Sequence, residues 1–115
     1  MPTSNPEIYW GQDAILELTL SRLPEYDGSL VGANLRFDLG LKYGENPIQT
    51  VLNTDITRDS EAAEQLELSL QVDGAALQAA LTQEKRHTLK WQVLLSPLAG
   101  GQQTFQGSLV VLPAY

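Results

Sequence analysis

The chain has 115 residues and no cysteine, which excludes disulfide scaffolds, thiol nucleophiles and zinc sites built on cysteine. Its formal net charge is −7, with 7 lysines and arginines against 14 aspartates and glutamates. Nucleic acids and anionic membrane surfaces require clustered positive charge, so we expect neither as a partner. A single domain of this length buries roughly two-thirds of its unfolded surface, and we expect it to fold without a metal or cofactor.

Residues 1–6 are predicted to form an extended N-terminal arm, because they hold two prolines among Thr, Ser and Asn. The N-terminus lacks the basic and apolar regions of a signal peptide, and no apolar run approaches the ~18–20 residues that cross a bilayer. We therefore expect a protein made in a cytoplasm without its own secretion signal. Tyr9 and Trp10 follow the arm and either pack on the domain, the commoner outcome, or anchor a neighbour.

Three segments before the helix alternate apolar with polar residues, which is the period of a half-buried strand. The segments are 13–21, with Leu16, Leu18 and Leu20 inward; 33–43, with Leu35, Phe37, Leu39 and Leu41 inward; and 66–72, with Leu66, Leu68, Leu70 and Val72 inward. Gly40 falls on the outward face of the second segment, where it favours a bulge or an early end. Residues 23–32 collect turn formers and are predicted to be a loop.

The segment 48–52 (IQTVL) is rich in β-branched residues and is predicted to be a short strand. Pro47 precedes it and cannot donate a ladder hydrogen bond, which places this strand at a sheet edge. The following residues, 53–65, are polar and acidic. They are expected to form an exposed loop with one helical turn at 60–65.

The period changes at Asp73, a residue type that caps helix N-termini. Leu77 and Leu81 recur at a helical spacing among alanines, which predicts one short helix at about 74–84 that closes an end of the domain. Segments 88–96 and 104–112 alternate again around a Pro/Gly-containing loop, as in an antiparallel hairpin.

The predicted fold is therefore all-β: an immunoglobulin-like antiparallel β-sandwich of six to eight strands, with the helix before the C-terminal hairpin. A small barrel is the structural alternative. Residues 7–113 would form the single domain, and residues 114–115 a short C-terminal tail.

Candidate chemical sites are few. Residues 53–64 place oxygen-bearing side chains at the spacing of a calcium loop, but Arg58 stands where that loop needs a glycine, so an acidic solvated loop is the favoured interpretation. The single histidine, His87, has no identifiable catalytic or metal-binding partner. Glu61 and Glu64 lie in too polar a segment for acid–base work. Trp91 is interpreted as a core tryptophan rather than a platform for sugars. We predict no catalytic residues and no metal site.

Several motifs along the chain form a pattern: Gly11-x-Asp13 before a strand, DGSLVGANL at 27–35, the 66–72 strand, a short helix, LKWQV at 89–93 and FQGSLVV at 105–111. The pattern resembles the immunoglobulin-like domains of tailed-phage virion proteins, and is similar in particular to the N-terminal domain of baseplate upper proteins and related tail or fibre adaptors. The resemblance implies a virion component that docks by surface pairing and carries no catalytic residues.

The expected function is that of a non-enzymatic structural or adaptor protein of a bacteriophage virion, located in the tail, baseplate, neck or fibre attachment. Its partners would be other virion proteins and copies of itself, bound through edge strands and the terminal arms. The residues expected to bind partners are Tyr9, Trp10, Ile48, Val51 and Tyr115. The alternative is a carbohydrate- or ligand-binding β-sandwich module.

Overall fold

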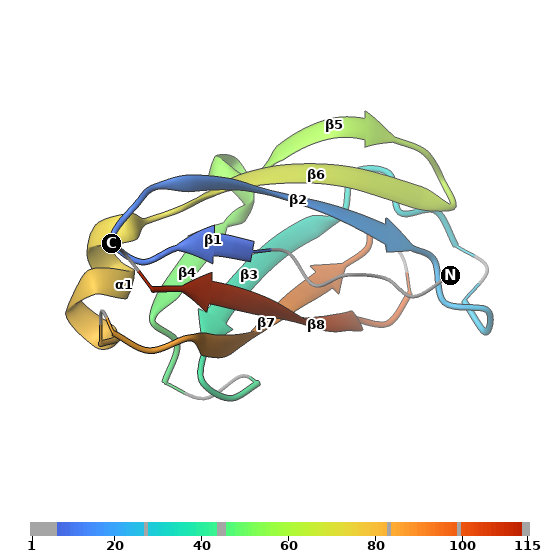
Figure 1. Ribbon diagram of the computed structural model, residues 1–115. Helices are drawn as coiled ribbons and strands as arrows, with labels where there is room; N and C mark the ends of the chain where they lie inside the picture. Colours follow the sequence, from blue (N-terminus) through green and yellow to red (C-terminus); the bar gives the residue numbers. More distant parts are fainter. Residues whose placement is uncertain (1–6, 27, 44–45, 83, 99, 114–115) are drawn as a thin grey trace, which may run out of the picture.

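The computed structural model describes residues 7–26, 28–43, 46–82, 84–98 and 100–113. They form eight strands, a short α-helix and a 3₁₀ turn (Figure 1). The strands are β1 Glu7–Tyr9, β2 Ala14–Ser21, β3 Asn34–Gly40, β4 Gln49–Leu52, β5 Thr57–Glu61, β6 Gln65–Val72, β7 His87–Ser96 and β8 Gln103–Leu112. The helix α1 spans Gly74–Ala80, and the 3₁₀ turn η1 spans Asn53–Asp55.

The strands are arranged in two facing sheets of unequal width. The five-stranded sheet has the order β1-β8-β7-β3-β4, and the three-stranded sheet has the order β2-β6-β5. This arrangement is an immunoglobulin-like β-sandwich, which confirms the predicted fold class. One pairing is not antiparallel, however, because β1 runs parallel to β8, with Ile8 opposite Val111.

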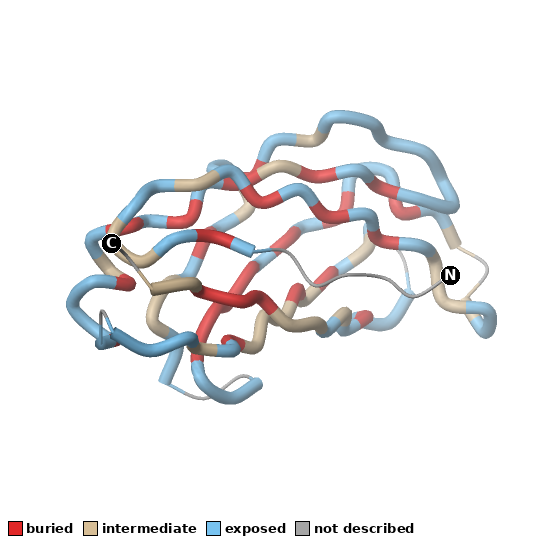
Figure 2. The backbone as a smooth tube through the Cα atoms, viewed as in Figure 1, coloured by how far each residue is buried: buried red, intermediate tan, exposed pale blue. Residues whose placement is uncertain are grey.

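The interior between the sheets is filled by the inward residues of the alternating strands. Along β2 and β6 buried positions alternate with exposed or half-buried ones (Figure 2). The largest fully buried side chains are Phe37 together with Leu20, Leu30, Leu35, Leu39, Leu66, Leu68, Leu77, Leu89, Leu95 and Leu109. Each fully buried leucine contributes roughly 1.5–3 kcal/mol, so this layer is the main source of stability.

Strand β3 ends earlier than its leucine pattern predicts. Leu41 was expected to face inward, but β3 stops at Gly40 and 62% of the Leu41 surface is exposed. Once the chain leaves the sheet, the alternation of side chains no longer applies. The prediction for Leu41 was therefore wrong, whereas the early end at Gly40 was one of the two expected outcomes.

The polar segment after β4 is not the loop that was expected. Residues 57–61 form β5, which pairs with β6 from Glu61 opposite Leu66 to Thr57 opposite Ser69. The strand has a bulge between Arg58 and Ser60. Its side chains are polar because β5 lies at the edge of its sheet, so the sequence carries no apolar alternation that would predict it.

Helix α1 is fixed at its start by the adjacent residue Asp73 and at its end by Trp10, which is distant in sequence. At its start, the Asp73 carboxylate accepts a hydrogen bond from the Ala75 N–H at 2.9 Å, as predicted for a capping residue. At its end, the Trp10 indole Nε1–H donates to the Leu81 carbonyl at 2.9 Å. The helix ends at Ala80, four residues before the predicted end, and its Leu77 side chain is fully buried. No helix among the described residues is long and apolar enough to span a membrane.

Trp91 lies flat across the neighbouring strand because that strand has no side chain there. Trp91 is paired with Gly107 in the β7–β8 ladder, and its ring stacks on Phe37 with 6.4 Å between centroids. A Cβ atom added at Gly107 would lie 2.4 Å from the Trp91 Cζ2 atom. The glycine in β8 therefore makes room for the indole.

Replacing Gly107 with alanine should push the indole off Phe37 and lower the free energy of unfolding by about 1–3 kcal/mol, the usual cost of overpacking. The matched control is Gly101→Ala, since a Cβ there meets no atom within 4 Å; its effect should stay within about 0.5 kcal/mol. Urea denaturation measures both. Equal stability of the two variants would show that Trp91 does not depend on Gly107.

Candidate docking edge

Four strands lie at the ends of the two sheets: β1, β4, β2 and β5. Free strand edges pair readily with other chains, and charges or bulges are the usual protection. Strand β5 has both, with its bulge and the charged residues Arg58, Asp59 and Glu61. Strands β1 and β2 each carry one exposed glutamate, Glu7 and Glu17. Only β4 (QTVL) carries no charge, so it is the least protected of the four edges.

Strand β4 presents backbone groups on its free side. On its inner side it pairs with β3, with Phe37 opposite Val51 and Leu39 opposite Gln49. The Leu39 carbonyl accepts a hydrogen bond from the Ile48 N–H at 2.7 Å, so Leu39 directs its backbone toward β4. Backbone groups alternate in direction along a strand. The N–H and C=O of Thr50 therefore point away from β3, toward an empty strand position.

The side chain of Gln49 joins the two sheets beside this edge. Strand β5 pairs with β6 no further than Ser69, so residues 70–72 of β6 have β2 as a neighbour but not β5. The Gln49 Nε2 donates to the Gln71 carbonyl, and its Oε1 accepts from the Asp73 N–H, both at 2.9 Å. One side-chain amide thus satisfies the backbone that β5 leaves uncovered.

Two hollows flank β4. The hollow on the side of the sheet gap has a volume of about 410 Å³ and is lined by Gln49, Thr50, Val51, Asp55, Gln71 and Asp73. The hollow at the other end of the strand, about 380 Å³, is lined by Asn34, Leu35, Arg36, Leu52, Asn53 and Thr54. Leu52, which lines the second hollow, lies on the outer face of the sheet with 56% of its surface exposed. Of the residues around the first hollow, two are acidic and none is basic.

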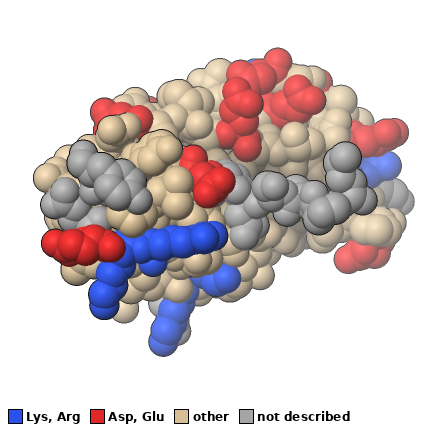
Figure 3. Space-filling model, viewed as in Figure 1, with Lys and Arg blue, Asp and Glu red and all other residues tan. Residues whose placement is uncertain are grey.

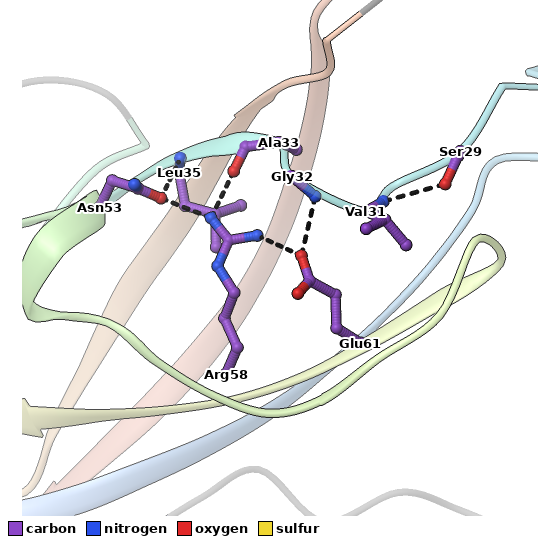
Figure 4. A network of polar contacts seen from close by, with 8 residues as sticks. All are labelled: Ser29, Val31, Gly32, Ala33, Leu35, Asn53, Arg58 and Glu61. Carbon is purple, nitrogen blue, oxygen red and sulfur yellow. Dashed lines mark hydrogen bonds and ion pairs between the residues drawn. The ribbon is translucent and has the colours of Figure 1, made fainter.

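A polar network fixes the turn that leads out of β4 (Figure 4). The Asn53 side-chain oxygen accepts from the Leu35 N–H at 3.1 Å and from Arg58 Nη2 at 2.6 Å. Arg58 also donates to the Ala33 carbonyl and to Glu61, the latter at 3.0 Å. The network ties β5 to the start of β3. Because Asn53 directly follows β4, its bonds to Leu35 and Arg58 also fix the end of β4.

Glu61 completes this network, and its pKa is shifted by the groups around it. Its carboxylate accepts the Gly32 N–H at 2.8 Å, and this hydrogen bond is the main reason that the pKa of Glu61 lies below its ordinary value of 4.5. Partial burial opposes the shift, and the positive charge of Arg58 adds to it. The carboxylate is therefore the form that the fold favours.

The residues expected to bind partners do not form one surface. Tyr9 is 50% exposed, whereas Trp10 is partly buried and donates its indole N–H to Leu81, so it packs within its own chain. Ile48 is partly buried against the core, and Val51 faces the interior with 6% of its surface exposed. Neither side chain is therefore open to a partner, and Ile48 lies just before β4 rather than in it. Tyr115 lies outside the described residues.

The sequence analysis missed the side chains that shape this edge. Leu52 was part of the predicted strand but was not singled out, although an apolar residue on the outward face of a short edge strand is a signal of docking. Asp55 and Asp73 were considered only as members of a calcium-like loop and as a helix cap. Gln49 left no signal, because nothing local shows that its amide reaches across to β6.

The calcium-like segment has no geometry for a calcium ion. Asn53 and Asp55 belong to the 3₁₀ turn, and residues 57–61 are an extended strand whose side chains alternate instead of converging. His87 begins β7, with its Nε2 3.1 Å from the Thr82 carbonyl. Within the part of the chain that the structure describes, no group of three His, Asp or Glu side chains is placed to hold a metal ion.

Charge is unevenly distributed over the two faces (Figure 3). In this view a group of aspartates and glutamates lies over the three-stranded sheet, and a group of lysines and arginines lies on the side of the five-stranded sheet, next to another acidic side chain. Glu17, Asp59 and Glu67 line a hollow on the first face. On the second face Arg36 pairs with Asp38 at 3.3 Å, and Lys90 lies 5.8 Å from the centre of the Tyr43 ring.

No family model matches the sequence, and no curated protein matches it significantly. Among solved structures, the chain is similar to the periplasmic chaperone SfaE, with 10% sequence identity and a TM-score of 0.48. The match covers 95% of this chain and 55% of the chaperone chain, so the chain spans about half the length of that protein. A likeness this distant carries no argument about function.

Substituting Gln49 with alanine should lower the free energy of unfolding by about 1–2 kcal/mol, because two backbone groups lose their hydrogen bonds. Gln71→Ala is the matched control: Gln71 takes part through its backbone carbonyl alone, and its change should stay within about 0.5 kcal/mol. Urea denaturation gives the stabilities. If the two variants unfold at the same urea concentration, the hydrogen bonds of the Gln49 side chain do not contribute to stability.

Replacing Glu61 with glutamine should remove a pH-dependent part of stability. Because the pKa of Glu61 is lowered in the folded chain, its contribution is complete above the unfolded pKa and is lost as the pH falls through the folded value. The stability difference between the native chain and E61Q should therefore be largest near neutrality and shrink below pH 4.5. Denaturation at a series of pH values measures it, and parallel curves would contradict the assignment.

Proposed function

We propose that this chain is a non-enzymatic structural or adaptor protein that docks onto other proteins by adding one of their strands to β4. The observation that carries the proposal is the uncharged free edge of β4, where Thr50 presents its N–H and C=O to an unoccupied strand position beside the exposed Leu52. Strand addition of this kind takes its affinity from backbone hydrogen bonds and its specificity from alternate side chains.

The setting that we propose is a tailed-phage virion, in its tail, baseplate, neck or fibre attachment, with other virion proteins as partners. This part rests on the resemblance of the sequence motifs to immunoglobulin-like domains of phage virion proteins. The geometry is compatible with it, because a small rigid domain with one unprotected edge can be repeated around a symmetric particle. The N-terminal arm of residues 1–6, also expected to dock, lies outside the described residues.

A structural role is favoured over catalysis because the space between the sheets is occupied by aliphatic side chains. Among the residues that the structure describes, the buried polar or charged side chains are Asp38 and Gln103. Asp38 accepts hydrogen bonds from the Thr50 hydroxyl at 2.7 Å and from Arg36. Its carboxylate therefore joins β3 to β4 and has a structural role. The carbohydrate-binding alternative draws less support, since one face of Trp91 is stacked on Phe37 and its ring also covers Gly107.

A proline at position 50 tests the proposed edge directly. Thr50→Pro removes the outward N–H at a position where an edge strand tolerates proline. Thr50→Val is the matched control, because it also loses the hydroxyl bond to Asp38 but keeps the N–H. Each variant should be purified and shown to fold by circular dichroism before it is used.

Purified phage particles from the strain that carries the gene should contain the native chain and the Thr50→Val variant, as measured by mass spectrometry. Incorporation of Thr50→Pro should fall at least about tenfold, which corresponds to the loss of roughly one hydrogen bond's worth of binding energy. Absence of the native chain from particles would contradict the virion setting. Equal incorporation of both variants would contradict docking at β4.

A further inference from the structure

The two sides of the β4 edge differ in chemistry, and this difference specifies what a docking strand must carry. Side chains of an added strand alternate between the two faces of the sheet. On one face they meet the hollow beside Gln49 and Val51, and on the other they meet Leu52 and Thr50. Successive side chains of an added strand therefore contact two different surfaces in alternation.

The hollow beside Gln49 favours a positive charge. Asp55 and Asp73 lie in its wall, both exposed, and no basic residue lines it. Asp73 accepts the Ala75 N–H, a bond that leaves further lone pairs of its carboxylate available. A lysine or arginine side chain can lay its apolar stem along Val51 and bring its charge to these carboxylates.

The opposite face favours an apolar side chain. Leu52 is 56% exposed there, and Leu94 lies on the same row of the sheet beyond Arg36. Arg36 is paired with Asp38 at 3.3 Å, so this part of the face presents little net charge. Apolar contact across neighbouring strands is the interaction that remains.

A second copy of this chain is a poor occupant of the edge. Each copy carries a net charge of −7, and pairing β4 with β4 would bring the Asp55 and Asp73 pairs of two copies toward one another. Their repulsion opposes such a dimer, whereas the same charge attracts a basic partner. The occupant is therefore a segment of a different protein.

We propose that the strand received by β4 is an extended segment of another protein in which basic residues alternate with apolar ones, with the basic side chains directed to Asp55 and Asp73 and the apolar ones to Leu52. This inference rests on the proposed function, since it specifies the partner of the same edge.

The probe is a blocked peptide of about seven residues, the length of an ordinary strand, in which lysine alternates with valine. It is titrated into the isotope-labelled full chain and followed by NMR at low salt. We expect shifts at Gln49–Leu52 and Asp55, and an affinity at least about tenfold lower for the peptide with glutamate in place of lysine, since each tenfold step corresponds to one charge-assisted contact. Shifts confined to Glu17, Asp59 and Glu67 would overturn the proposal.

Two double variants with equal charge changes separate local recognition from general attraction. Asp55→Asn with Asp73→Asn should weaken binding of the lysine peptide by about tenfold, and asparagine at position 73 still caps the helix. Asp59→Asn with Glu67→Gln changes the face of the three-stranded sheet by the same charge and should leave the affinity unchanged. Equal effects of the two double variants would overturn the proposal.

The Thr50→Pro variant distinguishes failure of this inference from failure of the proposed function. If it abolishes binding of the lysine and glutamate peptides alike, and the two bind the native chain equally, strand addition stands and the basic–apolar pattern is wrong. If it binds the lysine peptide as the native chain does, docking at the β4 edge is itself wrong, and the inference falls with it.

Discussion

The unequal width of the two sheets is the constraint on which the rest of this structure depends. Three strands face five, so the narrower sheet leaves part of the wider one uncovered, and β4 is one edge of the wider sheet. In addition, β5 pairs with only part of β6. The sandwich must close this side with side chains, and it does so at two points: Gln49 bridges to β6, and Arg58 ties β5 to the chain before β3.

These side-chain closures leave the edge itself open. A further strand after β4 in the same sheet would pair with the backbone of Thr50, but the chain instead turns through Asn53–Asp55 and crosses to the other sheet. The side-chain amides of Gln49 and Asn53 and the guanidinium of Arg58 close this side of the sandwich, while the edge of β4 stays exposed. The hollow lined by Asp55 and Asp73 lies beside this open edge.

The sequence predicted the elements whose stability comes from alternating burial. Leu16, Leu18 and Leu20 lie inward as expected, because a half-buried strand imposes its period on its own residues. Strand β5 gave no such signal, since an edge strand with polar faces is stabilised by backbone pairing to β6, which depends on residues far away in the sequence. For the same reason the parallel pairing of β1 with β8 could not be predicted.

The candidate site was predictable only in part. Pro47 and the β-branched residues after it indicate an edge strand, and β4 lies at the edge of its sheet. The side chains were harder to assign: Val51 faces the interior and Leu52 faces outward, and the direction of one short strand depends on where the neighbouring ladder places it. The reach of Gln49 across the sheet gap is a property of the assembled sandwich alone.

Charge and edge protection work together in this domain. Exposed carboxylates on β1, β2 and β5 discourage pairing at those edges, both through repulsion between copies and through the cost of desolvating a charge. Strand β4 has no charge of its own, so its selectivity must come from what lies beside it. Asp55 and Asp73 provide that selectivity without occupying the edge, because they repel another acidic strand and attract a basic one. An edge that is open in its backbone can in this way still discriminate among the strands that approach it.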